Sequence, residues 1–293
     1  MGFRSTAQNV RLVAVGALVL VLTAGYLILL RNFNVAETPR ERHFGVTGAI
    51  RPAAEIYIEP ISIDALNEAM QVRATIEPSL SVGGEVLAGS GRDLTLIITH
   101  DKTVEEIKLA ANEHLAETNF EVDLNGGNVA HYPLDSYRAD LGVQVFEASS
   151  PSTGPTTPLP AKITMWEGVL GFHLHTTQRL GAESGKVQLS LDITRSGAFA
   201  LFALAAYGAM VVLGGCAFVI GFLTFVDVRR PEATLIGALA AIAFALPVLR
   251  NALPGAPPLG VQADMFVFLW TELVAVFSLA LLVFKWARIG PRP

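Results

Sequence analysis

The chain has 293 residues, a formal net charge of −5 and a mean hydropathy of +0.47. The negative charge argues against nucleic acid as a partner, because binding to phosphates needs an excess of Lys and Arg. The single cysteine, Cys216, excludes an intrachain disulfide and a cysteine-based metal site. Four long apolar runs, taken below in chain order, place the chain among multi-pass membrane proteins.

The first apolar run covers residues 12–30. It is long enough to cross the hydrocarbon core of a bilayer, which needs about 20 residues. A cleaved signal peptide is the alternative, but its apolar part would be about 7–15 residues long and a small-residue cleavage site would follow. We therefore expect an uncleaved transmembrane helix at 12–30, preceded by a cytoplasmic tail at 1–11, and the cleavage alternative stays open.

Residues 31–196 form one long polar segment with 13 Lys and Arg against 22 Asp and Glu, a net charge of −9. An acidic segment of this kind disfavours anionic lipid headgroups as well as nucleic acid. Apolar and polar residues alternate in several stretches, which predicts strands with one buried face. These stretches are 70–77, 94–99, 120–124, 141–145 and 187–194. About seven or eight short strands predict an antiparallel β-sandwich in this segment.

Four local signals refine that prediction. The Asn-Gly-Gly-Asn sequence at 125–128 favours a tight hairpin turn. The alternation changes phase at Pro60, which predicts a bulge or an edge strand. Residues 104–115 fit either a helical stripe or a strand, and both readings stay open. The composition of residues 149–160 indicates a loop.

Three apolar runs close the chain, and we interpret them as transmembrane helices at 197–225, 233–251 and 265–284. The middle helix reaches a sufficient length only if it continues through Arg250 and Asn251. Only residues 194–197 separate the last predicted strand from the first of these helices, so the β-domain should sit directly on the bilayer. Such a joint suits transmission of force or docking, although economical folding would give the same connection.

Basic side chains in short flanks predict the orientation in the membrane. They occur in the amino tail, in the loop between the second and third helices and in the carboxyl tail 285–293, at Arg4, Arg11, Arg229, Arg230, Lys285, Arg288 and Arg292. By contrast, the 250–264 loop carries only Arg250. We therefore expect both tails in the cytoplasm and residues 31–196 on the outer side of the cytoplasmic membrane.

The sequence His131-Tyr132-Pro133-Leu134-Asp135-Ser136-Tyr137 joins two predicted strands. Proline fixes its own φ, and Asp135 is expected to cap backbone amides freed by the turn. This aromatic-Pro-x-Asp turn also resembles the signature loop of pentameric ligand-gated channels, which couple a β-sandwich to membrane helices. The chain departs from that family in having one helix before the β-domain, three after it, and no polar-striped pore helix.

Two further sets of residues could carry chemistry. His173 and His175 lie two apart on one face of a predicted strand and could supply two ligands to a zinc ion, although ordinary surface histidines have the same spacing. Glu272 is the one charged residue inside the apolar runs, where a carboxylate is costly and normally has a partner. We expect a structural pair between Arg250 and Glu272, with an ion or solute path lined by both as the alternative.

The carboxyl-terminal third of the chain resembles a membrane protein family. The resemblance rests on Arg229-Arg230-Pro231-Glu232, on the segment 245–260 with its Arg-Asn-x-Leu-Pro-Gly-x-Pro-Pro-x-Gly motif, on Asp264 and on Leu269-Trp270-Thr271-Glu272. This family is catalogued as "domain of unknown function 4436". The resemblance extends to the Tyr-Pro-Leu-Asp-Ser-Tyr turn and to the order of the helices. It implies the same topology, and it implies no activity and no catalytic residues.

The sequence contains no P-loop, no G-x-S-x-G, no H-E-x-x-H and no dinucleotide-binding fingerprint. We predict a non-enzymatic integral membrane protein without cofactor, metal or catalytic residues. Its acidic β-domain would act as a binding or assembly module for a protein partner or for a second copy of the chain. A small transporter or channel subunit is the alternative, and a metal-dependent envelope enzyme using His173 and His175 is the third reading.

Overall fold

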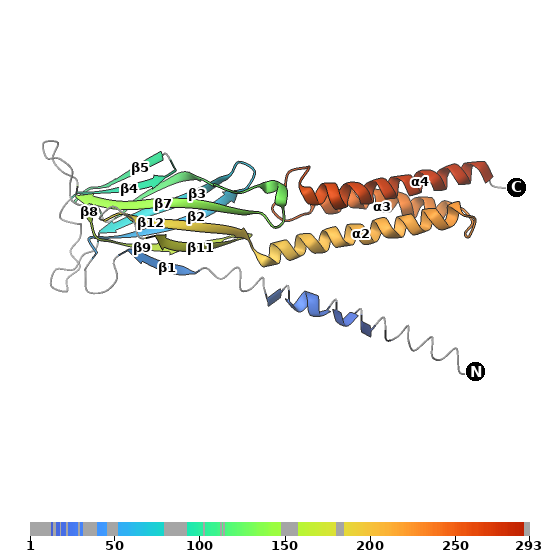
Figure 1. Cartoon of the computed structure of the whole chain (residues 1–293), viewed down its shortest axis with the longest axis horizontal. Helices are drawn as coiled ribbons and strands as arrows, with labels where there is room; N and C mark the ends of the chain where they lie inside the picture. Colours follow the sequence, from blue (N-terminus) through green and yellow to red (C-terminus); the bar gives the residue numbers. More distant parts are fainter. Residues whose placement is uncertain are drawn as a thin grey trace.

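The computed structural model describes residues 40–45, 52–78, 93–147, 158–179 and 185–289, except 102, 112 and 114, together with part of the segment 13–31. A β-domain occupies one end of the elongated molecule, and the helices α2, α3 and α4 lie side by side at the other end (Figure 1). The elements of each half are contiguous in sequence, so the chain completes its described strands before it enters these helices.

One sheet of the β-domain has five strands in the order β1-β9-β2-β3-β6. Neighbouring strands in it are antiparallel except for β2 and β9, which are parallel. The prediction of a purely antiparallel domain is therefore wrong at this pair. The strands are β1 (Glu41–Gly45), β2 (Ala54–Asp64), β3 (Ala69–Pro78), β6 (Ala116–Asp123) and β9 (Ala161–Trp166).

The other sheet has seven strands, of which six follow the order β10-β11-β12-β7-β4-β5, while β8 pairs with β7. All its described pairings are antiparallel. The strands are β4 (Leu94–His100), β5 (Thr103–Leu109), β7 (Ser136–Glu147), β8 (Pro158–Leu159), β10 (Gly168–Val169), β11 (Phe172–Arg179) and β12 (Val187–Arg195). The described residues thus contain more strands than the sequence predicts, because β1, β8 and β10 are short.

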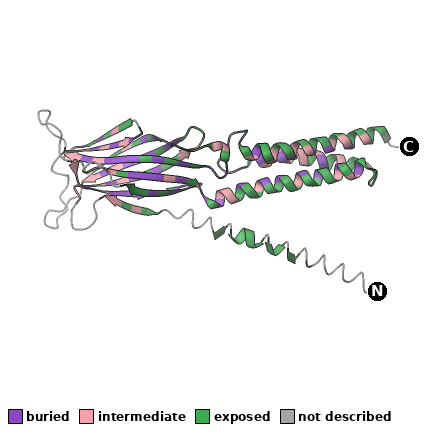
Figure 2. Ribbon diagram, viewed as in Figure 1, coloured by how far each residue is buried: buried purple, intermediate pink, exposed green. Residues whose placement is uncertain are grey.

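The two sheets share one hydrophobic core. Ile56 and Met70 from the five-stranded sheet and Leu96, Leu141 and Leu191 from the other belong to the same buried cluster. Buried and exposed residues alternate along the strands (Figure 2), as expected for sheets with one face turned inward. A core of this extent explains how the domain folds although the chain has only one cysteine.

The Asn-Gly-Gly-Asn sequence at 125–128 does not form the predicted hairpin. It connects β6 and β7, which belong to different sheets. Gly126 has a positive φ of +70°, and at Gly127 the ring of Tyr137 occupies the space where a Cβ would lie. The two glycines therefore let the chain cross between the sheets next to a buried tyrosine.

The other local signals have mixed outcomes. The register of β2 against β3 shifts between Pro60 and Ser62, which confirms the bulge, whereas the edge-strand alternative is wrong because β2 lies between β9 and β3. The ambiguous stretch 104–115 is a strand over its first half, 104–109, as part of β5. Most of the predicted loop 149–160 lies outside the described residues.

Three helices follow the β-domain, and each is long and apolar enough to cross a membrane. They are α2 (Gly197–Phe225), α3 (Ala233–Asn251) and the continuous helix from Asp264 to Arg288, which begins with the π-helical turn Asp264–Phe268 and continues as α4 (Leu269–Ile289). The bounds of α2 and α3 coincide with the predicted runs. These helices indicate a multi-pass membrane protein.

The predicted first helix at 12–30 lies partly outside the described residues, and the tail 1–11 lies wholly outside them. The residues described between 13 and 31 are helical and exposed. Within the described part of the chain, three helices are long and apolar enough to cross a membrane.

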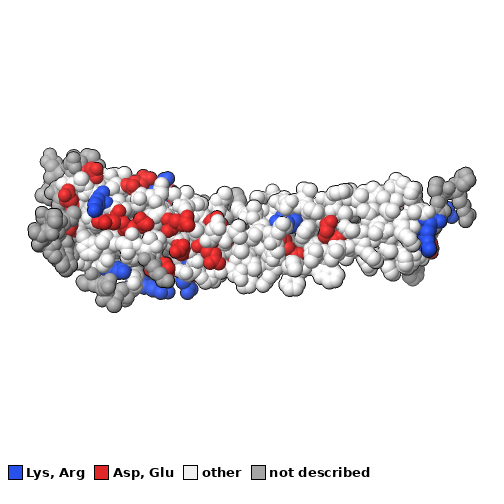
Figure 3. Space-filling view, turned by 90° about the horizontal axis from the view of Figure 1, so that it is seen from above, with Lys and Arg blue, Asp and Glu red and all other residues white. Residues whose placement is uncertain are grey.

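The helices pack through small residues. A Cβ on Gly214 would lie 2.9 Å from the Cβ of Thr271, and a Cβ on Gly221 would lie 2.6 Å from the Cβ of Ser278. Glycine at both positions lets α2 approach α4 closely, as is common between helices in membranes. On the face seen in Figure 3, charged groups are frequent on the β-domain, whereas the helical half shows only a few near the β-domain and then none up to its basic far end.

Candidate functional site

The connection between β12 and α2 is a single residue, Ser196. Its backbone N–H donates to the carbonyl oxygen of Gly171 at 2.9 Å, and its side-chain oxygen accepts a hydrogen bond from the N–H of Phe199 at 3.4 Å. Ser196 therefore caps α2 while it is tied to the β10–β11 turn. A connection this short, with both of its polar groups engaged, makes the end of the β-domain continuous with the start of the helix.

Arg195, the last residue of β12, forms a buried ion pair with Asp135. The Nε atom of Arg195 donates to both carboxylate oxygens at 3.1 and 3.0 Å, and the two side chains are 5% and 0% exposed. The hydroxyl of Tyr137 donates to the same carboxylate at 2.9 Å. Among the described residues, Asp135 thus binds the side chains of Arg195 and Tyr137 instead of the backbone amides that were predicted for it.

The guanidinium group of Arg195 lies between two aromatic rings. Its central carbon is 4.5 Å from the ring centroid of Phe172 and 5.2 Å from that of Tyr132. Cation–π contact of this kind is stronger when the cation is removed from water. Burial raises the pKa of the Tyr132 phenol to about 12, although the positive charge of Arg195 opposes the change. Tyr132 therefore remains a neutral hydrogen-bond donor at physiological pH.

That donor reaches the loop between α3 and α4. The hydroxyl of Tyr132 donates to the carbonyl oxygen of Pro254 at 2.8 Å. The next residue, Gly255, has a φ of +73°, and a Cβ there would lie 2.6 Å from Nη1 of Arg195. The loop thus lies against the Arg195–Asp135 pair, and the absence of a side chain at position 255 permits the close approach.

The predicted pair between Arg250, at the end of α3, and Glu272 does not form. It pairs with Asp264, with Nη2 2.7 Å from a carboxylate oxygen, and both side chains are about 5–6% exposed. The same Nη2 donates to the carbonyl oxygens of Pro257 and Pro258, and the hydroxyl of Tyr207 on α2 donates to Asp264 at 2.9 Å. This second pair therefore joins α2, α3 and the start of α4.

Asp264 has a geometric advantage over Glu272 as a partner for Arg250. It lies at the beginning of the helix, level with the end of α3, whereas Glu272 lies about two turns further along. The Oε2 atom of Glu272 is buried and has no hydrogen-bond partner among the described residues. The predicted pair between Arg250 and Glu272 is therefore wrong, and Asp264 takes the place of Glu272 as the partner of Arg250.

We use the term junction network for the residues that connect the two halves: Tyr132, Asp135, Phe172, Arg195, Ser196, Tyr207, Arg250, Pro254, Gly255 and Asp264. Each of its two ion pairs is electrically neutral and shielded from water. Removing one partner would leave a buried charge uncompensated, which is costly. The network can hold the β-domain in one position relative to the helices, and no group in it is a free nucleophile or base.

The two histidines share one face of a strand, as predicted, but the side chain next to His175 is an arginine. His173 and His175 lie on the exposed face of β11, and Nδ1 of His175 is 3.2 Å from a guanidinium nitrogen of Arg42. A positively charged neighbour disfavours a bound cation. Among the described residues there is no cluster of three or more His, Cys, Asp or Glu side chains that could hold a metal ion.

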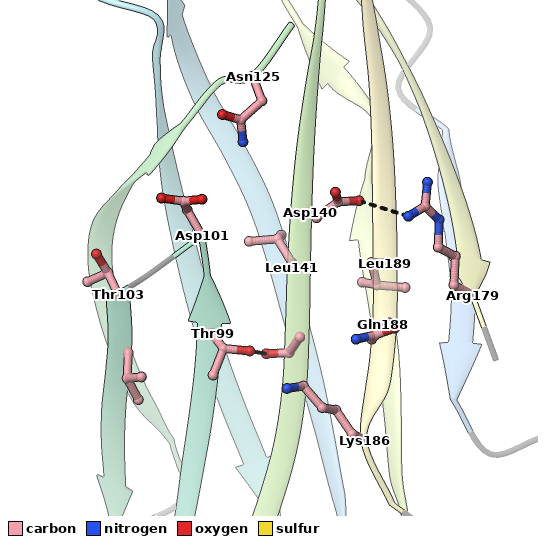
Figure 4. Close-up of a pocket in the computed structure, with 12 residues that line it drawn as sticks. Thr99, Asp101, Thr103, Asn125, Asp140, Leu141, Arg179, Lys186, Gln188 and Leu189 are labelled. Carbon is pink, nitrogen blue, oxygen red and sulfur yellow. Dashed lines mark hydrogen bonds and ion pairs between the residues drawn. The ribbon is translucent and has the colours of Figure 1, made fainter. Parts of the chain in front are cut away.

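A polar recess of about 510 Å³ lies on the seven-stranded sheet, across β4, β7 and β12 (Figure 4). Asp140 and Arg179 face each other at 3.9 Å on one side of it, and Thr99 donates to the carbonyl oxygen of Gly142 in its floor. Asp101 and Gln188 also line it. A surface with charges of both signs and several hydrogen-bonding groups suits a polar partner more than an apolar ligand.

Sequence reasoning missed Arg195 and Asp264. Both stand at the boundary between a polar segment and an apolar run, where a charge is ordinarily solvated and attracts no notice. The signal that could have identified them is charge balance. Arg195 just before α2 has the opposite charge to Asp135 in the Tyr-Pro-Leu-Asp turn, and Asp264 at the start of the last helix has the opposite charge to Arg250.

Comparison with known families divides the chain near this junction. Residues 47–193 match a family described as "Domain of unknown function (DUF4436)", and residues 195–289 match a second one, "Domain of unknown function (DUF8686)". The Arg-Asn-x-Leu-Pro-Gly motif, on which the resemblance to the first family was based, lies within the second match. No curated protein matches the chain.

Substitution of either member of the Arg195–Asp135 pair should destabilise the protein more than substitution of both. We expect Asp135→Asn or Arg195→Gln alone to lower the free energy of unfolding by about 3–5 kcal/mol, because each leaves one buried charge without its partner. The double variant should recover part of that loss. Thermal or denaturant unfolding in detergent measures the effect, and additive losses in the double variant would contradict this account of the pair.

Proposed function

Since the chain belongs to the family described as "Domain of unknown function (DUF4436)", whose name assigns no activity, we propose its function from its geometry. We propose that it is a non-catalytic membrane protein that holds an acidic β-domain on the outer face of the cytoplasmic membrane. There it serves as a binding or assembly module for a polar partner in the cell envelope.

The observation that carries this proposal is the junction network. A domain tethered by a flexible linker can sample many positions, which adds an entropic cost to forming a specific assembly. Here, one residue separates β12 from α2, and the Arg195–Asp135 pair lies against the loop that carries Pro254. A domain fixed in this way presents its surface in a defined position above the membrane, which favours docking.

The distribution of charge supports the proposed orientation. Arg229 and Arg230 lie in the connection between α2 and α3, and Lys285 and Arg288 lie near the end of α4, all at the end of the helices away from the β-domain. Basic residues in short loops are retained on the cytoplasmic side. The β-domain would accordingly be outside.

The polar recess is the part of the β-domain best suited to the partner. It combines a concave shape with the charged side chains of Asp101, Asp140 and Arg179 (Figure 4). The net charge of −9 over residues 31–196 favours a partner with a basic contact surface.

Cysteine labelling tests the orientation. In a Cys216→Ser background, a cysteine at Leu115 should react with a membrane-impermeant maleimide on intact spheroplasts, because Leu115 is exposed at the end of the β-domain away from the helices. A cysteine at Arg230 should react only after lysis. Labelling in the reverse order would contradict the proposed location.

Site-specific photo-crosslinking in living cells tests the binding role. A photo-reactive residue at Gln188, in the recess, should give one adduct of constant mass, and an adduct of twice the chain mass would identify a second copy as the partner. The matched control is Glu117, which is exposed on the other sheet. Absence of an adduct at 188, or the same adducts at 188 and 117, would contradict a partner at the recess.

A further inference from the structure

An open groove of about 760 Å³ lies at the level where the β-domain meets the helices. Its walls come from separate parts of the chain: the end of β2 with the β2–β3 turn, Val129 between β6 and β7, the β10–β11 turn, the end of β12 with the first turn of α2, and the α3–α4 loop. Phe199 on α2 and Pro254 in the loop are among the residues that line it. Because α2 is a candidate membrane span, the groove stands at the edge of the apolar layer, where lipid headgroups lie.

Leucine side chains surround this end of the β-domain. Leu66, Leu134, Leu170 and Leu259 belong to four different loops and are 61%, 72%, 74% and 78% exposed. Single exposed leucines are normal on a protein surface, but a group at one end marks contact with an apolar medium. Leu66 and Leu170 also line the groove, so its margin favours acyl chains.

Two charged residues are found among those that line the groove, Arg195 and Asp64. Among the described residues, Arg195 makes its side-chain hydrogen bonds through Nε alone, to Asp135. Its terminal nitrogens make no hydrogen bond among the described residues. Although the Arg195 side chain is only 5% exposed, it lines the groove, and Nη1 lies next to Gly255, which lines the groove too. A guanidinium group binds phosphate as well as carboxylate through charge-assisted hydrogen bonds.

Asp64 supplies the opposite charge. A hydrogen bond from the backbone N–H of Asn67, together with one from its side chain, holds the pKa of Asp64 below its usual value. Asp64 is exposed and is therefore an ionised carboxylate at neutral pH. The groove thus offers hydrogen-bond donors for a phosphate group, a carboxylate that can accept from an ammonium group, and an apolar margin.

We propose that this groove binds the headgroup of an aminophospholipid from the surrounding bilayer. The phosphate accepts hydrogen bonds from the terminal nitrogens of Arg195, the ammonium group donates to Asp64, and the acyl chains leave past Leu66 and Leu170. An anionic lipid without an amine would bind less well, because the negative charge of Asp64 would have no ammonium group to pair with. The proposal rests on the membrane placement of α2 but not on the orientation of the protein or on a protein partner.

The test uses the full chain in detergent micelles and native mass spectrometry with phosphatidylethanolamine, phosphatidylglycerol and phosphatidylcholine, each added separately. We expect one phosphatidylethanolamine retained per chain, with roughly tenfold weaker retention of the other two lipids, because each lacks a primary ammonium group. Equal retention of the three lipids, or a preference for phosphatidylglycerol, would overturn the proposal.

Two variants locate the lipid. Asp64→Asn keeps an oxygen that can accept from the turn amides but removes the charge, and it should abolish the preference for phosphatidylethanolamine. Asp123→Asn is the matched control, because Asp123 is exposed at the same end of the β-domain but does not line the groove. Loss of the preference in both variants, or in neither, would contradict binding at this groove.

A second readout does not depend on the charge substitution. In a Leu170→Trp variant of the full chain whose native Trp166, Trp270 and Trp286 are replaced by Phe, brominated phosphatidylethanolamine in vesicles should quench the single tryptophan more than brominated phosphatidylglycerol at the same mole fraction. The preference should disappear when Asp64→Asn is added. Equal quenching by both lipids before that addition would show that the groove contacts the bilayer without selecting a headgroup, which would overturn the proposal.

Discussion

The buried ion pair between Arg195 and Asp135 is the interaction on which the rest of the structure depends. It joins the last strand of the β-domain to the connection between β6 and β7, and it places a guanidinium group between the rings of Phe172 and Tyr132. A charge removed from water must keep its counter-ion, so these segments cannot separate without a large loss of free energy. The β-domain and the start of α2 are thereby fixed to each other.

The second pair, Arg250 with Asp264, extends the same principle to the remaining helices. It holds the end of α3 and the start of α4 together, and Tyr207 brings α2 to the same carboxylate. The hydrogen bond from Tyr132 to Pro254 connects the two pairs. In the described residues, a one-residue connection and two buried ion pairs hold the two halves of the protein together. This arrangement is the one that the proposed binding role requires.

The sequence allowed much of the architecture to be predicted. Strands such as β3 and β12 follow from alternation because one face of each is buried, and α2 and α3 follow from apolar runs that match the thickness of a bilayer. These patterns are local, because each one reflects which faces of a single strand or helix meet water, lipid or the protein core.

Pairings between distant segments could not be predicted in the same way. The two glycines at 126 and 127 fit a hairpin locally, but the strands on either side of them belong to different sheets, and the parallel pairing of β2 with β9 joins segments about a hundred residues apart. The pairing of Arg250 with Asp264 depends on the place where the chain re-enters the helical bundle after the α3–α4 loop, which the apolar pattern alone does not give. Glu272 is conspicuous in the sequence because it lies inside an apolar run, but Arg195 and Asp264, at the edges of such runs, form the buried ion pairs.

The central claim is that the junction network fixes the β-domain relative to the helices. Distance measurement between two spin labels tests this most directly, with one label on β6 at Glu117 and the other at Val228 between α2 and α3, in a Cys216→Ser background in lipid nanodiscs. The account predicts a single narrow distribution that broadens in Asp135→Asn. A broad distribution in the protein with an intact Asp135, unchanged by the substitution, would contradict it.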